Sequence, residues 1–419
     1  MKTINQIGII AIAIFMFVLI GCKKETVMND PIPTPDPQNT TEELICKVGD
    51  PIGTVVTKTI GTTGGTLQSE DGFIKVMIPA GTVSSDRSFT LQSIENTVPS
   101  GAGTAFRLTP HGEQFAKPVK IQFNYAGKKH IQADNMGIAF QDAKGIWQSV
   151  NKVERDTIAK TITIETTHFS DWSAFELLSI EPKLAHVNLG GSITLKAVEW
   201  TEDQLLPSPY QPIAYKSAKN VSNWALGGAG VLKPNGSQAT YTAPNKIPKG
   251  NPVAVSVEVA GKAKKLLVSN IYIGGEGIYF RINNAEEWTY APVPIAGLAA
   301  ADWSIVSGPP FINNKADGSF SIRHLGGRFN DIQYSWNPNN CQFQYTMLNA
   351  QNYTQHYMIG KSVYFSPGYL YISKYGKVGD FISGEFLLEK AGHWDPSNII
   401  NPYLRTVTIE GFFHVKRTQ

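Results

Sequence analysis

Short runs of alternating apolar and polar residues constrain the fold of this chain more than any other feature of its sequence. Such runs recur along most of its length: FIKVMI (73–78), VKIQFNY (119–125), TITIETT (161–167), SITLKAV (192–198), VAVSVEV (253–259) and TVTIEGFFHV (406–415). Gly, Pro, Asn and Asp separate the runs, and helical periodicity is hard to find. Because a period of two places successive side chains on opposite faces of a strand, the pattern predicts an all-β fold of antiparallel sandwiches or barrels.

The N-terminus carries a different kind of segment. Lys2 precedes about fifteen mostly apolar residues that end at Cys22, a run too short for a comfortable membrane span but with the charged-then-apolar order of a secretory signal. The tetrapeptide Leu19-Ile20-Gly21-Cys22 resembles a bacterial lipobox, in which the cysteine is acylated and becomes the first residue of the mature protein. The resemblance predicts a signal peptide over residues 1–21 and lipidation of Cys22. An uncleaved helical anchor is the alternative.

Acylation of Cys22 also predicts where the protein resides. Each methylene of an acyl chain contributes about 0.8 kcal/mol of membrane affinity, so two or three chains hold a protein durably. Lys23-Lys24-Glu25 follows without an aspartate, and by resemblance to Gram-negative lipoproteins this favours the outer membrane, with a body that is either periplasmic or surface-exposed. Because the proline-spaced PIPTPDP (31–37) favours an extended chain, residues 22–52 are predicted to form the lipidated cysteine and a stalk.

Charge and cysteine content narrow the range of partners and cofactors. The formal net charge of the full chain is only +3, and it falls by one if Lys2 is removed with the signal. Such a small, dispersed charge argues against nucleic-acid binding, which usually shows a basic stripe. Cys46 and Cys341 lie in segments assigned to different modules, so we expect them to be unpaired. Three cysteines exclude a cysteine-rich zinc site, and the sequence predicts neither a metal site nor a cofactor.

The body of the chain is too long for one hydrophobic core, and we predict three modules. The first, residues 53–178, contains these motifs in order: Gly64-Gly65-Thr66-Leu67, Ile78-Pro79-Ala80-Gly81, Arg107-Leu108-Thr109-Pro110-His111-Gly112 and Lys117-Pro118-Val119. In order and spacing they resemble the ZU-five domain, a β-sandwich shared by ankyrins, netrin receptors and zonula-occludens proteins and also found in bacterial surface proteins. The resemblance implies a protein-binding module, in which His111 is a corner histidine bonded to the backbone.

The second module, residues 179–273, has a different pattern. Two of its segments, Trp224-Ala225-Leu226-Gly227-Gly228 and Ala239-Thr240-Tyr241-Thr242-Ala243-Pro244, resemble bacterial immunoglobulin-like repeats. In such repeats the tryptophan packs inside a β-sandwich and the Tyr-Thr-Ala-Pro segment ends a strand. The resemblance therefore implies a second sandwich, of a kind that usually serves as a spacer.

Aromatic residues concentrate in the third module, residues 274–419. Eleven of the sixteen tyrosines and four of the eight tryptophans fall here, so a ligand site is expected in this β-domain before either of the others. Aromatic rings stack on sugars but also fill cores, and both uses stay open. An exposed binding platform is predicted from four tyrosines: Tyr364, Tyr369, Tyr371 and Tyr375.

The segment TTHFSDW, residues 166–172, brings a histidine, a serine and an aspartate close together. If the alternation of the preceding strand continues, one face carries Thr166, His168, Ser170 and Trp172, and the other carries Phe169 and Asp171. Asp171 could not then orient His168, so a Ser-His-Asp triad is not expected. The simplest interpretation is the end of a strand, with Phe169 and Trp172 buried on opposite sides.

A second interpretation of this segment comes from resemblance. His168-Phe169-Ser170 resembles the His-Phe-Ser site at which ZU-five domains and the related function-to-find domains of some animal proteins cut themselves. The resemblance implies that the Ser170 hydroxyl attacks the Phe169 carbonyl while His168 takes the proton. The chain is thus expected to be a non-catalytic binding or scaffold protein anchored in the outer membrane, in contact with an envelope protein or glycan. The alternative is a self-processing protein cleaved at Phe169-Ser170.

Overall fold

Strands make up nearly all regular structure in the computed structural model of this chain, so the prediction of an all-β fold is confirmed. The structure describes residues 44–418 except 127–132, 202–207, 261–263, 301–302, 326–331, 398–402 and 404. The predicted signal peptide, Cys22 and most of the predicted stalk lie outside these residues. The one helical turn described is a 3-10 helix, Ala133–Asn135. Among the described residues, no helix is long and apolar enough to cross a membrane.

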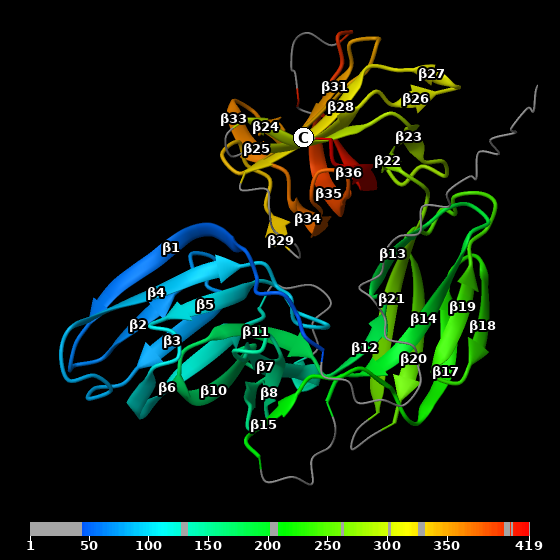
Figure 1. Cartoon of the computed structure of the whole chain (residues 1–419). Helices are drawn as coiled ribbons and strands as arrows, with labels where there is room; N and C mark the ends of the chain where they lie inside the picture. Colours follow the sequence, from blue (N-terminus) through cyan, green and yellow to red (C-terminus); the bar gives the residue numbers. More distant parts are fainter. Residues whose placement is uncertain are drawn as a thin grey trace, which may run out of the picture. The chain divides into compact units, whose positions relative to one another are not determined.

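Two sheets enclose the core of the first module (Figure 1). The larger has the order β1 (Pro51–Ile60), β4 (Arg87–Ile94), β5 (Ala105–Thr109), β11 (Asp171–Glu176), β7 (Met136–Gln141), β8 (Trp147–Val150) and β15 (Tyr210–Pro212). The smaller has the order β2 (Gly65–Gln68), β3 (Ile74–Ile78), β6 (Gln114–Asn124), β10 (Thr161–His168) and β9 (Glu154–Asp156). The edge strand β15 comes from beyond the predicted boundary at residue 179 and pairs with β8. The first sheet therefore includes chain that the sequence assigned to the second module.

The second module is also a pair of sheets around its own core. One contains β12 (Leu178–Glu181), β14 (Ser192–Glu199), β19 (Gln238–Thr242), β18 (Val231–Asn235) and β16 (Lys216–Ser217). The other contains β13 (Leu184–Val187), β21 (Lys265–Ile273), β20 (Val253–Val259) and β17 (Val221–Gly227). Tyr241 is fully buried in this core and its hydroxyl donates to the Ala229 carbonyl (2.8 Å), whereas Trp224 packs on the core from its margin. The central aromatic residue is therefore the tyrosine, and not the expected tryptophan.

One long sheet forms most of the third module. Its main path is β24 (Ile295–Ala300), β25 (Trp303–Gly308), β28 (Ser319–Leu325), β30 (Cys341–Thr346), β31 (Asn352–Thr354), β35 (Phe381–Trp394), β36 (Arg405–Lys416), β22 (Gly277–Ile282), β23 (Thr289–Ala291), β26 (Phe311–Ile312) and β27 (Lys315–Ala316). A branch from β35 adds β34 (Gly368–Tyr375) and β29 (Ile332–Tyr334), and a separate hairpin consists of β32 (His356–Ile359) and β33 (Ser362–Phe365). Ala296 on β24 and Ala291 on β23 belong to the same core, so the sheet curls around its interior.

Candidate functional site

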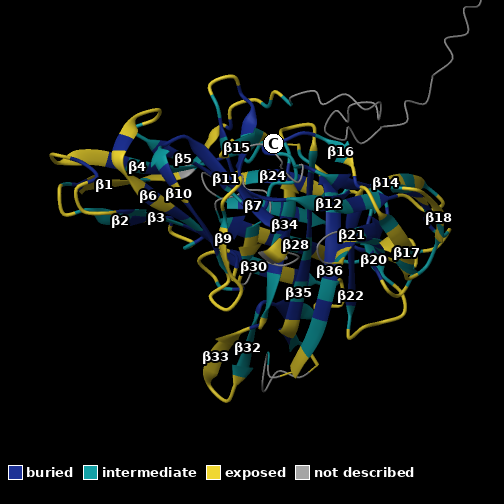
Figure 2. Cartoon of the chain, turned by 90° about the horizontal axis from the view of Figure 1, so that it is seen from below, coloured by how far each residue is buried: buried dark blue, intermediate teal, exposed yellow. Residues whose placement is uncertain are grey.

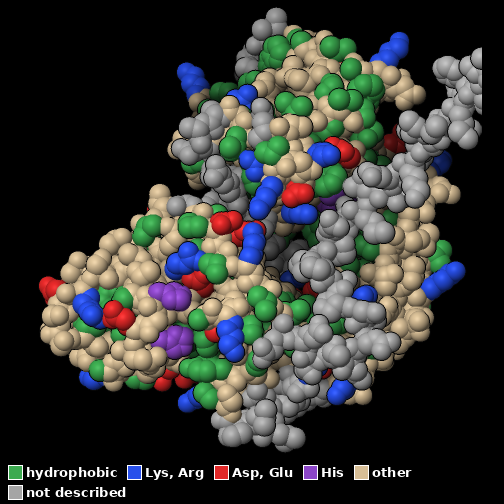
Figure 3. All heavy atoms as spheres, viewed as in Figure 1, with side chains coloured by type: hydrophobic (Ala, Val, Ile, Leu, Met, Phe, Trp, Pro, Cys, Tyr) green, Lys and Arg blue, Asp and Glu red, His purple; other side chains and the backbone are tan. Residues whose placement is uncertain are grey.

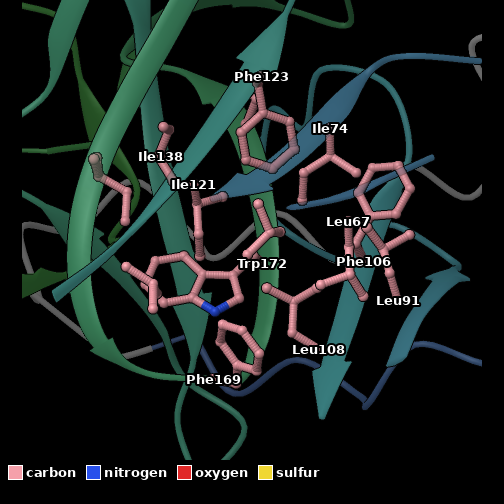
Figure 4. Close-up of a cluster of buried hydrophobic side chains, with 14 of the residues drawn as sticks. Leu67, Ile74, Leu91, Phe106, Leu108, Ile121, Phe123, Ile138, Phe169 and Trp172 are labelled. Atoms are coloured by element: carbon pink, nitrogen blue, oxygen red, sulfur yellow. The ribbon is translucent and has the colours of Figure 1, made fainter. Parts of the chain in front are cut away.

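The segment 166–172 contains a change of sheet. Strand β10 ends at His168 in the five-stranded sheet, and β11 begins at Asp171 in the seven-stranded sheet. The predicted continuous alternation is therefore wrong. The register of β10 against β6 shifts between Thr166 and His168, and the chain then crosses the sandwich. As a result Phe169 and Trp172, which were expected on opposite sides, both enter the same core (Figure 4).

Ser170 lies at this crossover and is almost completely buried. Its hydroxyl donates a hydrogen bond of 2.6 Å to the Gln141 carbonyl on β7. That bond directs the hydroxyl proton to a backbone acceptor, and not to the histidine that self-cleavage would require. The hydroxyl therefore holds the start of β11 against β7, which is a structural role.

His168 is half-buried in an aromatic cluster. Its ring meets Phe140 edge-on, with 4.8 Å between ring centroids, and lies 5.6 Å from the Trp172 ring. Burial lowers the pKa of His168; a hydrogen bond to the Phe169 backbone opposes this, and the neighbouring His111 adds to the lowering. The imidazole is therefore neutral near pH 7 and could accept a proton, although Ser170 does not direct its proton toward it.

The Phe169 carbonyl, the one that self-cleavage would attack, accepts a hydrogen bond of 3.0 Å from the Gly112 amide. An N–H group in this position is what an oxyanion hole supplies in acyl transfer. The Phe169 ring is held between Phe115 and Phe89, at centroid distances of 4.8 and 5.9 Å. The predicted site thus has a polarised carbonyl in a fixed position, next to a hydroxyl that is bonded elsewhere.

Asp171 is paired with an arginine from a distant part of the sequence. Its two carboxylate oxygens accept hydrogen bonds from Nε and Nη2 of Arg107, at 2.8 and 2.7 Å. The two residues are direct neighbours across β11 and β5, and this interaction raises the pKa of Arg107. A bidentate pair of this kind neutralises the buried carboxylate, so Asp171 serves the sandwich and does not orient His168. His111 has an exposed side chain, and its backbone bridges to Phe169.

The structure does not bring the four predicted platform tyrosines onto one face. Tyr364 is 45% exposed on the separate hairpin strand β33, whereas Tyr375 is 8% exposed in the core, where its hydroxyl is 2.7 Å from Ser304 Oγ. Tyr369 and Tyr371 are half-buried on β34, and the Tyr369 hydroxyl donates to Glu385 Oε1 (2.9 Å). A register shift after Ile372 turns Tyr375 inward, and the sequence has no visible signal for that bulge. Tyr357, which was not among the predicted residues, stacks its ring on Tyr364 with a centroid distance of 5.8 Å and an interplanar angle of 26°.

A surface depression of about 670 Å³ lies beside β2, β3 and β6. The charged residues that line it are Lys117, Lys120 and Glu165. Lys117 donates to the Ala80 carbonyl (2.8 Å), and Lys120 lies 3.5 Å from Glu165, so both ammonium groups already have partners. Within the described part of the chain, no group of three or more His, Cys, Asp or Glu side chains could hold a metal ion. On the face drawn in Figure 3, basic and acidic side chains are interspersed.

A scan against protein-family models and a search of curated proteins each find no match to this chain. The resemblances to ZU-five and immunoglobulin-like domains therefore stay predictions.

Proposed function

We propose that this chain is a lipoprotein anchored in the outer membrane through Cys22, and that it acts there as a non-catalytic binding or scaffold protein in contact with an envelope protein or glycan. One observation carries the non-catalytic assignment: the Ser170 hydroxyl, in the segment with the best catalytic resemblance, is bonded to the Gln141 carbonyl. The neighbouring Asp171 is engaged by Arg107. Both groups thus stabilise the β-sandwich, and binding falls to the exposed surfaces of the modules.

The anchor can be tested by metabolic labelling. Cells given an alkyne-tagged palmitate should label the wild-type chain and retain it in the outer-membrane fraction, because acyl chains on Cys22 dominate its membrane affinity. Cys22→Ala should lose the label and leave that fraction. Cys46→Ala, which removes a half-buried free thiol of the body, should keep both properties. Labelling of Cys22→Ala would contradict the proposed anchor.

Cross-linking tests the binding role. A lysine-reactive cross-linker should join the wild-type chain to a recurrent envelope component, and failure to join it to any would contradict the proposed binding function.

Self-cleavage at Phe169-Ser170 is the second candidate, and the hydrogen bond from Gly112 to the Phe169 carbonyl is the observation that favours it. In that reaction Ser170 Oγ would leave Gln141 and bond to the Phe169 carbonyl carbon, and His168 would take the hydroxyl proton. The C–N bond would then break as the nitrogen of Ser170 gained a proton, and the acyl group would become an ester. Water would hydrolyse the ester to a Phe169 carboxylate and a fragment beginning at Ser170.

Mass spectrometry of the denatured protein separates the two candidates. Residues 37–419 form one compact unit, so this segment can be expressed without the signal. The proposal of a non-catalytic protein predicts a single intact mass for wild type and for Ser170→Ala. Fragments 37–169 and 170–419 in wild type, absent from Ser170→Ala and from His168→Gln, would instead establish self-processing.

A further inference from the structure

The hairpin of β32 and β33 is a two-stranded sheet of its own, separate from the main sheet of the third module. Within the described residues these two strands pair only with each other, in the register Tyr357 to Tyr364 and Met358 to Val363. Figure 2 draws β33 as exposed. Strand β32 is tied to the rest of the module by a hydrogen bond from the Met358 amide to the Tyr403 carbonyl (3.1 Å), so the exposed β33 is the strand that a covering surface would contact.

Apolar side chains occupy both faces of this hairpin. The exposed fractions are 60% for Ile359, 56% for Val363, 45% for Tyr364 and 43% for Phe365. Side chains alternate along a strand, so Val363 and Phe365 share one face and Tyr364 lies on the other, beside Tyr357. A stacking sugar or a flat protein surface covers one face and leaves the other in water. A lipid interface covers both faces and the tip together.

Two lysines lie at the hairpin, Lys361 in its turn and Lys390 on β35, where Glu389 is exposed beside Lys390. Lys361 lies in the turn beside Gly360, which has φ of +61° and no neighbouring atom within 4 Å of its Cβ direction. Lys390 places its ammonium 5.8 Å from the centre of the Tyr357 ring. Lysines beside interfacial tyrosines extend their charged ends toward lipid phosphates while their stems lie on apolar surface.

We propose that the hairpin 356–365 inserts its apolar tip into an anionic lipid surface, with Lys361 at the phosphate level. This inference rests on the proposed function in one respect: anchoring through Cys22 places a membrane near the hairpin. Residues 22 and 44 are separated by a segment that spans at most about 80 Å when fully extended, so a body tethered at Cys22 stays within reach of the same membrane.

Vesicle flotation of residues 37–419 tests the proposal without the acyl anchor. The wild-type segment should float with phosphatidylcholine vesicles that contain one-third phosphatidylglycerol, and more weakly with pure phosphatidylcholine. Ile359→Ser combined with Val363→Ser should lower the bound fraction at least tenfold, and Lys361→Glu should lower it several-fold on anionic vesicles only. The matched control is Ile158→Ser with Val378→Ser, since Ile158 is 93% and Val378 63% exposed elsewhere on the chain. This control should bind as wild type does.

Two results would overturn the proposal: no flotation of the wild-type segment, or equal flotation of the hairpin variant and the control. If the wild-type segment does not float, hairpin-dependent retention on polysaccharide or hairpin-dependent self-association would identify a glycan or a second copy of the chain as the partner instead. Thermal melts of each variant verify folding, because the substituted side chains are exposed and should leave the melting temperature unchanged. Failure of this assay leaves palmitate labelling of Cys22 unaffected. Failure of the labelling likewise leaves this assay unaffected, since the tested segment lacks Cys22.

Discussion

Lowering the pH from 7 to 4 should destabilise the third module, and His324 alone should account for about 3 kcal/mol of the loss in unfolding free energy. His324 lies on β28, is 1% exposed, and has no hydrogen-bond partner at either ring nitrogen. Burial lowers its pKa to about 4. The residues that face it are Tyr334, Tyr375, Cys341 and Ser304. An interaction with the Leu325 backbone opposes the lowering of the pKa only in part, so a positive charge on the ring stays unfavourable.

The direction follows from proton binding. An unfolded histidine binds a proton below about pH 6.5, whereas the folded one binds only near pH 4, so the unfolded state takes up more protons between these values. The stability contributed by neutral His324 is fully present above pH 6.5 and is lost as the pH falls toward 4. His414, whose pKa burial also lowers to about 4, changes stability in the same direction.

Urea unfolding of residues 37–419 at pH 7, 5.5 and 4 measures the effect. His324→Leu should unfold more easily than wild type at pH 7 if packing is lost, but its stability should fall by about 3 kcal/mol less between pH 7 and pH 4. If His324→Leu keeps the full dependence, the buried histidine is not its source.

The local pattern predicted the strands well where side chains obey the period of two. Strand β20 alternates buried and half-buried residues from Val253 to Val259, and β3 does so from Ile74 to Ile78. A period of two is a property of neighbouring residues, so it can be seen in sequence without knowing the partner strand. The all-β class follows from such segments alone.

The candidate site depended on contacts that the local pattern does not contain. The chain changes sheets at Phe169-Ser170 because Phe169 packs on Phe89 and Phe115, which lie far back in the sequence. The partner of Asp171 is Arg107, 64 residues away, and the bulge that buries Tyr375 is set by its pairing with β35. Bulges and strand partners are chosen by tertiary packing, so alternation continued through them gives the wrong face.

Loss of the Arg107 guanidinium should cost about 3–5 kcal/mol of unfolding free energy, the cost expected when one partner of a buried ion pair is removed. Asp171 is 3% exposed and both of its oxygens bond to Arg107, so Arg107→Ala leaves a buried carboxylate without its counter-charge. The two residues lie opposite each other on β5 and β11, directly after the change of sheet. Urea unfolding at pH 7 measures the cost.

Two variants separate the buried charge from ordinary loss of contact. Arg107→Met combined with Asp171→Asn removes both charges and should recover most of the stability lost in Arg107→Ala, because no buried charge is left unpaired. Arg87→Ala breaks the ion pair between Arg87 and Glu113, in which the two side chains are 46% and 44% exposed. Because exposed ion pairs contribute little, this substitution should cost about 0–1 kcal/mol of unfolding free energy. Equal costs for Arg107→Ala and Arg87→Ala would show that Asp171 does not depend on its arginine. Its burial at the crossover would then be held by the packing of Phe169 and Trp172 alone.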